Sequence, residues 1–307
     1  MPINRRTFLS NSALLSGGLM LSKERTVATS LEKPSFPIPS DFSLKILATN
    51  WGYEGEIDTF CAEAKKAGYD GVEVWFPWGE KREAFFKAVE KYELEYAFLS
   101  GAWETVPEKH FVQYEKNISE AVKHKALFIN CHAGKDYFNF EQNKRVIEYA
   151  NRLSKETGVP ILQETHRSRM LFAAHLTHHF IQQIPDLRLT LDISHWCNVH
   201  ESLLADQPEA VAAALSRTDH IHARIGHAES PQISDLQAPE WSEAVKAHFA
   251  WWDQVVEMKV KAKQALTVTT EFGPPHYMPV IPYTGQAIAD NWKVNIAMMK
   301  LLRERYQ

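Results

Sequence analysis

Polar side chains that could together bind one metal ion stand at the ends of four short apolar runs. Glu164 ends residues 160–164, Asp192 and His195 end 189–195, His222 ends 220–222, and Glu271 ends 266–271. Carboxylate oxygens and imidazole nitrogens suit Mn²⁺, Mg²⁺, Co²⁺ or Zn²⁺. The absence of a thiolate argues against a structural zinc site. These side chains can meet only if their strands run parallel around a common axis.

The rest of the chain favours that arrangement, because strand-like runs alternate with amphipathic stretches. Strands are expected at 44–49, 71–76, 95–99, 126–131, 160–164, 188–193, 220–225 and 265–271. Helices are expected at 57–67, 81–92, 115–123, 141–157, 171–184, 209–216, 241–263 and 288–304. Eight such pairs predict an α/β fold of the (β/α)8 TIM-barrel type. A doubly wound open sheet lacks support, since no Gly-x-Gly-x-x-Gly follows a strand.

Polar and aromatic residues at the carboxyl ends of barrel strands share one cavity, where active sites lie. Those expected to contact substrate are Glu73, Trp75, Trp103, His132, His166, Trp196 and Arg224. His220 alternates with His222, and we favour His222 as the ligand because it is nearer the carboxyl end of its strand.

Each of these residues also has a simpler explanation when taken alone. A strand-end Glu is often a solvated loop residue or a helix cap. Asp192-x-x-His195 is compatible with a helix N-cap followed by a surface His. A Trp is often a packing residue, since Trp is highly buried on average. The conjunction of four strand ends in the right order favours the shared site over these alternatives.

The chain resembles the xylose-isomerase-like TIM-barrel superfamily, which includes sugar isomerases, ketose 3-epimerases and apurinic-site endonucleases. The motifs that carry the resemblance are Gly71-Val72-Glu73-Val74-Trp75, Gln163-Glu164-Thr165-His166, Leu191-Asp192-Ile193-Ser194-His195, His220-Ile221-His222-Ala223-Arg224 and Thr270-Glu271-Phe272-Gly273. The resemblance implies one divalent metal ion held by Glu164, Asp192, His222 and Glu271. In the epimerase branch, Glu164 and Glu271 would also be the paired acid and base, while His195 and Arg224 would bind substrate oxygens.

The endonuclease branch carries extra histidines for a three-zinc cluster, and this chain departs from that pattern. His132, His195 and His227 could fill some of those roles, so more than one metal stays open. The net charge of −4 predicts no broad basic surface, which makes nucleic acid a poor partner. The three cysteines show no Cys-x-x-Cys pair and predict no disulfide framework.

The N-terminus resembles a twin-arginine export signal at Asn4-Arg5-Arg6-Thr7-Phe8-Leu9. The apolar stretch that follows, residues 13–21, is too short to span a bilayer, which needs about 20 apolar residues. We therefore expect a signal peptide at 1–30, a linker at 31–43, a barrel at 44–307, periplasmic location and no membrane insertion after cleavage. The alternative is an exposed basic N-terminus of a cytosolic protein.

The first hypothesis for function is a metal-dependent isomerase or epimerase that removes a proton next to the carbonyl of a sugar. The second is a lyase on 3-keto-glycosides, in which the same step is followed by elimination. The third is a non-catalytic carbohydrate-binding barrel, against which the presence of both Glu164 and Glu271 speaks. All three expect a small carbohydrate as ligand, and the sequence leaves open whether the protein is a homo-oligomer.

Overall fold

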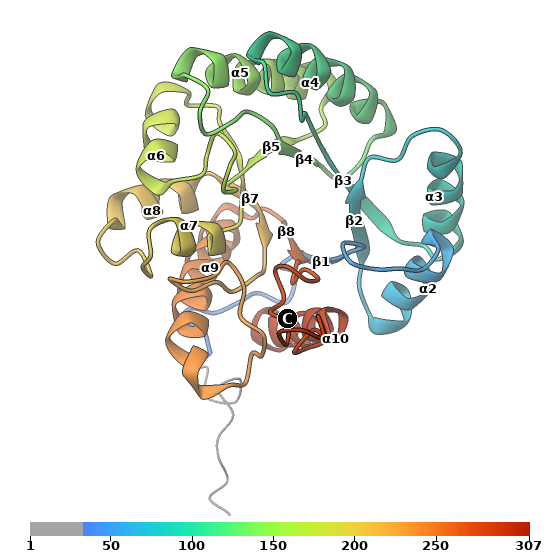
Figure 1. The fold of residues 1–307 in the computed structure, drawn as a ribbon, viewed down its shortest axis with the longest axis vertical. Coiled ribbons are helices and arrows are strands. Elements are labelled where there is room, and N and C mark those ends of the chain that lie inside the picture. Colours follow the sequence, from blue (N-terminus) through green and yellow to red (C-terminus); the bar gives the residue numbers. More distant parts are fainter. Residues whose placement is uncertain (1–32) are drawn as a thin grey trace, which may run out of the picture.

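The computed structural model describes residues 33–307, so the predicted signal peptide and the start of the linker lie outside the described residues. Eight parallel strands pair in chain order, and β8 closes on β1 (Figure 1). They are β1 (Leu44–Thr49), β2 (Gly71–Trp75), β3 (Glu95–Gly101), β4 (Ile129–His132), β5 (Ile161–Glu164), β6 (Leu189–Leu191), β7 (Thr218–His222) and β8 (Leu266–Thr270). The predicted TIM barrel is therefore confirmed.

Helices surround the barrel, as Figure 1 shows. They are α2 (Ile57–Ala67), α3 (Glu80–Lys91), α4 (Pro107–Ala121), α5 (Phe140–Thr157), α6 (Ala174–Gln183), α7 (Ser194–Val199), α8 (Pro208–Ser216), α9 (Ser242–Ala262) and α10 (Asn291–Tyr306), with 3₁₀ turns η2 (Val122–His124) and η3 (Pro239–Trp241). The prediction for α2 is correct at both ends. The prediction for α4 began eight residues too late, and α7 was not predicted.

Helix ends follow local chemistry. Gly68 ends α2 in the left-handed conformation at φ 100°, and Gly158 ends α5 at φ 73°. Asn139 and Gln142 form a reciprocal capping box that starts α5. Pro208 occupies the first turn of α8, where its missing N–H costs no hydrogen bond. Local sequence thus fixes where α2, α5 and α8 stop or start.

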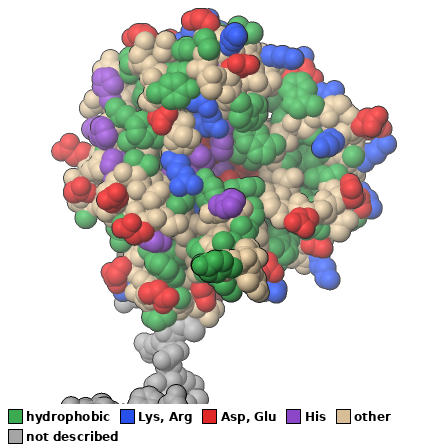
Figure 2. Space-filling model, in the orientation of Figure 1, with side chains coloured by type: hydrophobic (Ala, Val, Ile, Leu, Met, Phe, Trp, Pro, Cys, Tyr) green, Lys and Arg blue, Asp and Glu red, His purple; other side chains and the backbone are tan. Residues whose placement is uncertain are grey.

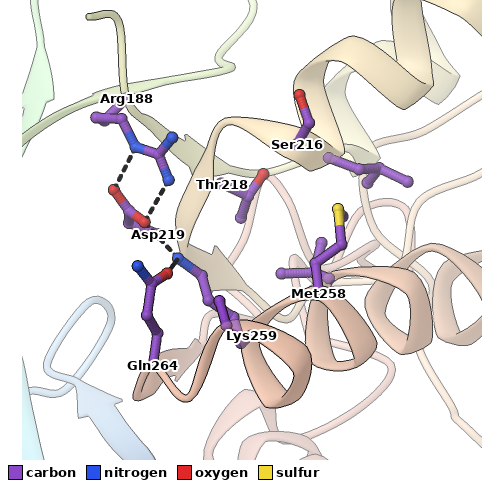
Figure 3. Close-up of a pocket in the computed structure, with 10 residues that line it drawn as sticks. Arg188, Ser216, Thr218, Asp219, Met258, Lys259 and Gln264 are labelled. Carbon is purple, nitrogen blue, oxygen red and sulfur yellow. Dashed lines mark hydrogen bonds and ion pairs between the residues drawn. The ribbon is translucent and has the colours of Figure 1, made fainter. Parts of the chain in front are cut away.

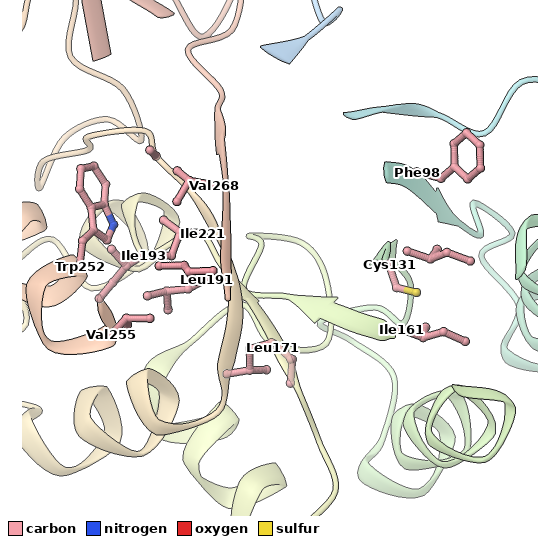
Figure 4. Close-up of a cluster of buried hydrophobic side chains, with 14 of the residues drawn as sticks. Phe98, Cys131, Ile161, Leu171, Leu191, Ile193, Ile221, Trp252, Val255 and Val268 are labelled. Atoms are coloured by element: carbon pink, nitrogen blue, oxygen red, sulfur yellow. The ribbon is translucent and has the colours of Figure 1, made fainter. Parts of the chain in front are cut away.

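The main hydrophobic core lies between the barrel and its helices (Figure 4). Outward-facing strand residues such as Leu191, Ile221 and Val268 pack with Trp252 and Val255 of α9. Each fully buried side chain of this size contributes about 1.5–3 kcal/mol to stability. The core holds the strands in a fixed register, so it also fixes the side chains at their carboxyl ends.

A second, smaller cluster fills the inside of the barrel and consists of Leu47, Ala97, Phe128 and Leu162. Two residues further along the strands, the same inner face carries Asn130, Glu164 and His222, because side chains alternate along a strand. The ring of His220 packs against Phe128 with 4.2 Å between ring centres. The apolar cluster is thus the floor beneath a layer of polar side chains.

A pocket of about 370 Å³ lies at the opposite end of the barrel (Figure 3). Arg188 precedes β6, and Asp219 is near the start of β7, so the pocket is at the amino ends of the strands. Arg188 makes two hydrogen bonds of 2.6 Å to Asp219, which also accepts one of 2.5 Å from Lys259. In TIM barrels this face supports stability and the opposite face carries chemistry.

The three cysteines are free and buried. Within residues 33–307, no helix combines the length and apolarity needed to span a membrane.

Candidate functional site

The ends of β5 to β8 bring four side chains into one buried group. Glu164, Asp192, His222 and Glu271 each offer a ligand atom, and these atoms lie within 4.8 Å of one another. None of the four residues is more than 6% exposed. The four residues expected to share a metal ion are thus brought together.

One carboxylate oxygen of Glu164 is fully engaged, while the other is free. Asn130 donates a hydrogen bond of 2.7 Å to Oε2, and Nε2 of His132 lies 2.5 Å from the same oxygen. Oε1 is buried and has no hydrogen-bond partner. Burial alone would raise the pKa of Glu164, but His132 and His222 outweigh it and lower the pKa. Glu164 therefore presents an ionised oxygen to the cavity.

The ring of His222 lies between carboxylates on both sides. Its Nε2 is 3.1 Å from Oε2 of Glu73. Its Nδ1 is 3.0 Å from Oε2 of Glu271 and 3.7 Å from Oε1 of Glu164. Burial would lower the pKa of His222, but Glu271, Glu73 and Glu164 raise it. Without a cation, the ring is therefore the group that carries positive charge between these acids.

Asp192 is held by the first turn of α7 and by Arg224. Ser194 donates to Oδ1 through its hydroxyl at 2.5 Å and its backbone N–H at 3.2 Å. Arg224 donates to Oδ2. Burial, together with the charges of Glu271 and Glu164, raises the pKa of Asp192 to about 6, although Arg224 opposes the shift.

Arg224 also determines the protonation of His195. Its Nη2 lies 2.7 Å from Nε2 of His195, and a guanidinium can only donate. Burial, followed by the charges of His166 and Arg224, lowers the pKa of His195, so the ring is neutral. Nε2 accepts, and the proton is therefore on Nδ1. That N–H is buried and has no partner, which leaves it available to a ligand oxygen.

The donor set fits a divalent cation. Three carboxylates and one imidazole converge, Oε1 of Glu164 lacks a hydrogen-bond partner, and Nδ1 of His222 faces Oε2 of Glu271 at 3.0 Å. A cation there would supply the charge that protonated His222 and Arg224 supply in its absence. Two neighbouring groups have similar spacing, Glu73 with His220 and His222, and His132 with Glu164 and His166. The number of ions is thus left open by the geometry.

Aromatic rings surround the mouth of the site in a chain of contacts. The ring centre of Trp75 lies 5.3 Å from that of Trp103 and 5.1 Å from that of His132. The ring of His166 follows, 4.7 Å from His132 and 3.9 Å from His195. A separate pair, Trp51 and Tyr277, has ring centres 4.7 Å apart. Figure 2 shows a hollow over the barrel centre with histidine and acidic side chains inside it. Such a wall suits the apolar faces of a sugar ring.

Gly273 allows one of these rings to come close. A Cβ on Gly273 would lie 2.3 Å from the Trp51 ring, so any larger residue would displace the indole. Gln232 fixes the Gly273 backbone by accepting from its N–H at 2.7 Å and donating to its carbonyl at 3.1 Å. The loop after β8 is thereby held against the loop after β7.

Two residues expected to contact substrate occupy other places. Trp196 is on α7 in the hydrophobic core, is fully buried, and donates from its indole to the Leu171 carbonyl at 3.0 Å. It has no surface toward the pocket, so that expectation is corrected. Glu73 lies beneath the four-residue candidate metal site, where Thr269 donates to Oε2 at 2.5 Å and His220 lies 3.3 Å away. Its position suits holding His222 rather than contacting substrate.

The other predicted contacts lie around the cavity. Trp75 and Trp103 are 40% and 50% exposed, and His132 and His166 border them. Arg224 is buried among Asp192, Glu271 and His195 rather than standing free at the mouth. His195 is also fully buried, which excludes the surface histidine considered as an alternative.

Asn130 and Tyr277 were missed as members of the site. Asn130 precedes His132 by two residues, so the alternation of a strand already places both on one face. Tyr277 lies in the loop after β8, and its ring centre is 4.9 Å from the Arg224 guanidinium. The place of this loop after the last strand predicts that it shapes the pocket rim, but only its conformation brings Tyr277 to Arg224.

Comparison with known families agrees with this architecture. Residues 61–236 match the family model described as "Xylose isomerase-like TIM barrel". The chain belongs to this family. Comparison with curated proteins gives no significant match.

Solved structures of the same fold are distant in sequence. 3-Keto-D-glucoside 4-epimerase YcjR from E. coli is 14% identical, with a TM-score of 0.56, over 85% of this chain and all of that one. The probable 3-DHS dehydratase AsbF from Bacillus anthracis is 15% identical, with a TM-score of 0.54, over 85% and 99%. A family protein from Mycobacterium smegmatis in complex with magnesium is 11% identical, with a TM-score of 0.55, over 86% and 98%. These likenesses show the shared fold.

Proposed function

We propose that the protein is a metal-dependent sugar isomerase or epimerase that moves a proton at the carbon next to a carbonyl. The observation that carries the proposal is the convergence of Glu164 and Glu271 on the same nitrogen of His222, with carboxylate oxygens 3.7 Å and 3.0 Å from Nδ1. Two carboxylates that face one cavity from β5 and β8 can serve as base and acid at one carbon.

The proposed metal ligands are Glu164, Asp192, His222 and Glu271. When bound, a divalent cation polarises the substrate carbonyl and makes the neighbouring C–H more acidic. Glu73 holds the far side of the His222 ring through Nε2, so that Nδ1 faces the cavity. This orientation is the usual role of a carboxylate behind a histidine ligand.

The remaining side chains bind substrate and move the proton. Glu164 accepts a proton on one side of the reacting carbon, while Glu271 exchanges one on the other. Nδ1–H of His195 donates to a substrate hydroxyl or carbonyl oxygen. Trp75 and Trp103 cover the apolar face of the ring and exclude water from the reacting carbon.

The activities named for two of the similar structures are compatible with this chemistry. The E. coli protein is named as a 3-keto-D-glucoside 4-epimerase, and the Bacillus anthracis protein as a probable dehydratase. The fold is what this chain shares with them. The proposal itself therefore rests on the paired carboxylates and the neutral His195 of this chain.

A proton-exchange screen tests the proposal. Protein loaded with Mn²⁺ is incubated in heavy water with a panel of ketoses and 3-keto-glycosides, and deuterium uptake is followed by mass spectrometry. Uptake next to the carbonyl in at least one substrate, and its loss in chelator-treated protein, is expected. Absence of exchange across the panel in fully metal-loaded protein contradicts the proposal.

Elimination from 3-keto-glycosides is the second candidate. An apolar cavity of about 580 Å³ adjoins the site at Trp75 and extends over Tyr53, Phe76 and Trp78. That space could hold the leaving group of a glycoside. Product analysis separates the two reactions, since elimination yields an unsaturated keto sugar and a free alcohol, whereas epimerisation leaves the glycosidic bond intact.

We also propose that the protein is exported to the periplasm by the twin-arginine route. This proposal rests on Arg5 and Arg6 and on the apolar stretch after them. Export of a folded protein would allow the metal to be loaded before the membrane is crossed.

A further inference from the structure

Most arginines in the described part of the chain are paired with a carboxylate, and two of the three exceptions lie in the same loop. Residues 33–307 contain ten arginines, and seven of them lie within 4.0 Å of an Asp or Glu oxygen. The three without such a partner in the described residues are Arg167, Arg169 and Arg217. Two of these lie in the loop after β5, next to Glu164, the proposed metal ligand and base.

Arg169 is the most unusual of them. Its Nε and Nη1 are shielded from solvent, and neither has a hydrogen-bond partner. Burial is the main cause that lowers its pKa, and the charges that oppose this are those of Glu164, Asp136 and Tyr277. Glu164 does not form a hydrogen bond or an ion pair with Arg169, because Oε2 of that carboxylate binds Asn130 and His132 and Oε1 has no hydrogen-bond partner. Shielded guanidinium donors of this kind require an acceptor that the described residues do not provide.

A second cationic side chain, that of Lys135, lies near Arg169 and comes from the loop after β4. Lys135 follows β4, forms no ion pair within the described residues, and has its pKa lowered by burial and then by the charge of Arg169. Arg167 stacks over Tyr277 at 4.7 Å and donates only to Asn198, at 3.3 Å. Asp136 is an exposed acid whose charge acts on both Arg169 and Lys135, but it forms an ion pair with neither of them. The three cations are thus left without a direct carboxylate partner among the described residues.

Hydrogen bonds and close packing hold the backbone of the loops that carry Lys135 and Arg169. Asn143 accepts from the Lys135 N–H at 3.2 Å and donates to the Lys135 carbonyl at 2.9 Å. Gly134 is in the left-handed conformation at φ 69°, and a Cβ there would lie 2.7 Å from Met170 Cβ. Met170 follows Arg169 directly and is buried. The two loops are therefore packed against each other, and the cations they carry are presented together.

We propose that Arg169, Lys135 and Arg167 form an oxyanion subsite at the rim of the metal-binding group, so that the substrate is a sugar derivative with a carboxylate or phosphate group. The inference rests on the proposed function for the location of the reacting carbon. A guanidinium binds both anions through charge-assisted hydrogen bonds. Figure 2 shows basic side chains beside the central hollow.

The test compares binding of matched sugars, because binding needs no turnover. Calorimetric titration of metal-loaded protein uses D-glucose, D-glucuronate and D-glucose 6-phosphate, which share a ring and differ in charge. The acidic sugars should bind about tenfold or more tightly than glucose, a difference typical of one charge-assisted hydrogen bond. The acidic sugar that binds more tightly shows whether the subsite prefers a carboxylate or a phosphate.

Variants locate the effect. Arg169→Gln and Lys135→Gln should each reduce the preference for the acidic sugars, and the double variant should abolish it, with glucose binding retained. Arg217→Gln is the matched control, since Arg217 is also partly buried without a carboxylate partner but lies at the amino end of β7. It should leave the preference unchanged.

Equal binding of neutral and acidic sugars by the wild type overturns the proposal, as does an unchanged preference in the double variant. Failure of the proposed function gives a different pattern. In that case no ketose or 3-keto-glycoside exchanges its proton, while the preference for acidic sugars and its loss in Arg169→Gln persist.

Discussion

Oε2 of Glu73 lies 3.1 Å from Nε2 of His222, and this contact turns Nδ1 of His222 toward Glu164 and Glu271. The two residues come from β2 and β7, which are separated around the barrel by β1 and β8. Burial would raise the pKa of Glu73, but the charges of His222 and His220 lower it, so the carboxylate is ionised. An ionised Glu73 thus fixes which ring nitrogen faces the proposed ion.

Replacement of Glu73 by Gln should weaken metal binding, and the variant should still fold into the same barrel. Loss of the charge behind a histidine ligand typically costs about 10–100-fold in metal affinity. Equilibrium dialysis with Mn²⁺ measures the change, and Glu83→Gln, an exposed residue of α3, is the control. Mn²⁺ affinity equal to that of the wild type would show that Glu73 does not support the site.

His195 should affect turnover and not metal content. Its Nδ1–H is free to donate to substrate, and it is outside the proposed ligand set. His195→Ala should therefore keep the metal and lower α-proton exchange, while His195→Asn, which keeps a donor, should restore part of the rate. Elemental analysis beside the exchange assay distinguishes the two effects. Loss of metal from His195→Ala would instead make His195 part of the metal-binding group.

Acid stability should depend on His248, a fully buried residue of α9. Burial lowers its pKa to about 4, and its Nε2 accepts from the Gly226 N–H at 3.2 Å. Between about pH 4 and 6.5 the unfolded chain holds a proton on this side chain that the folded chain does not. Stability is therefore fully present above pH 6.5 and falls as pH drops, by at most about 1.4 kcal/mol per pH unit.

The measurement for His248 is the free energy of unfolding in urea between pH 7 and pH 5. His248→Gln should show a smaller fall than the wild type, while His179→Gln, an exposed residue of α6, should show the same fall. Parallel pH profiles for wild type and His248→Gln would mean that the buried ring does not contribute in this way.

Export should depend on the paired arginines. Changing Arg5 and Arg6 to Lys is expected to leave the protein in the cytoplasm, because the receptor of the twin-arginine route reads that pair. Cell fractionation with immunoblotting checks the outcome, with Lys23→Arg as a control for a change of basic residue nearby. Periplasmic delivery of the double variant would show that the pair is not the signal.

The barrel and its four-residue group could be predicted because both depend on regular spacing. Parallel strands in a closed barrel end on one face, so Glu164 and Glu271 are near each other whatever the loops between them do. The same spacing could have predicted Asn130 as a site residue, since it lies two residues before His132 on the same face of β4. The strands and their ends were thus sufficient to predict the four proposed ligand residues.

Irregular segments set the limit of prediction. Trp196 is in a six-residue helix, α7, which is too short for a hydrophobic period to reveal which side is buried. Arg169 and Tyr277 reach the rim only through loop conformations, one of which includes Ser168 at φ 61°. The ion pair between Arg224 and Asp192 likewise depends on how the side chains are arranged in the folded protein, and the sequence spacing of the two residues does not reveal it.

The central claim is that Glu271 both binds the ion and moves the proton. Glu271→Gln removes the basicity and the charge but keeps an oxygen that can coordinate weakly. The decisive measurement is metal content by elemental analysis together with α-proton exchange in heavy water, beside Asp192→Ala. We predict that Glu271→Gln retains metal at saturating Mn²⁺ and loses about 10²–10⁴-fold in exchange rate, whereas Asp192→Ala loses the metal first. Full metal content with a wild-type exchange rate in Glu271→Gln would contradict the account.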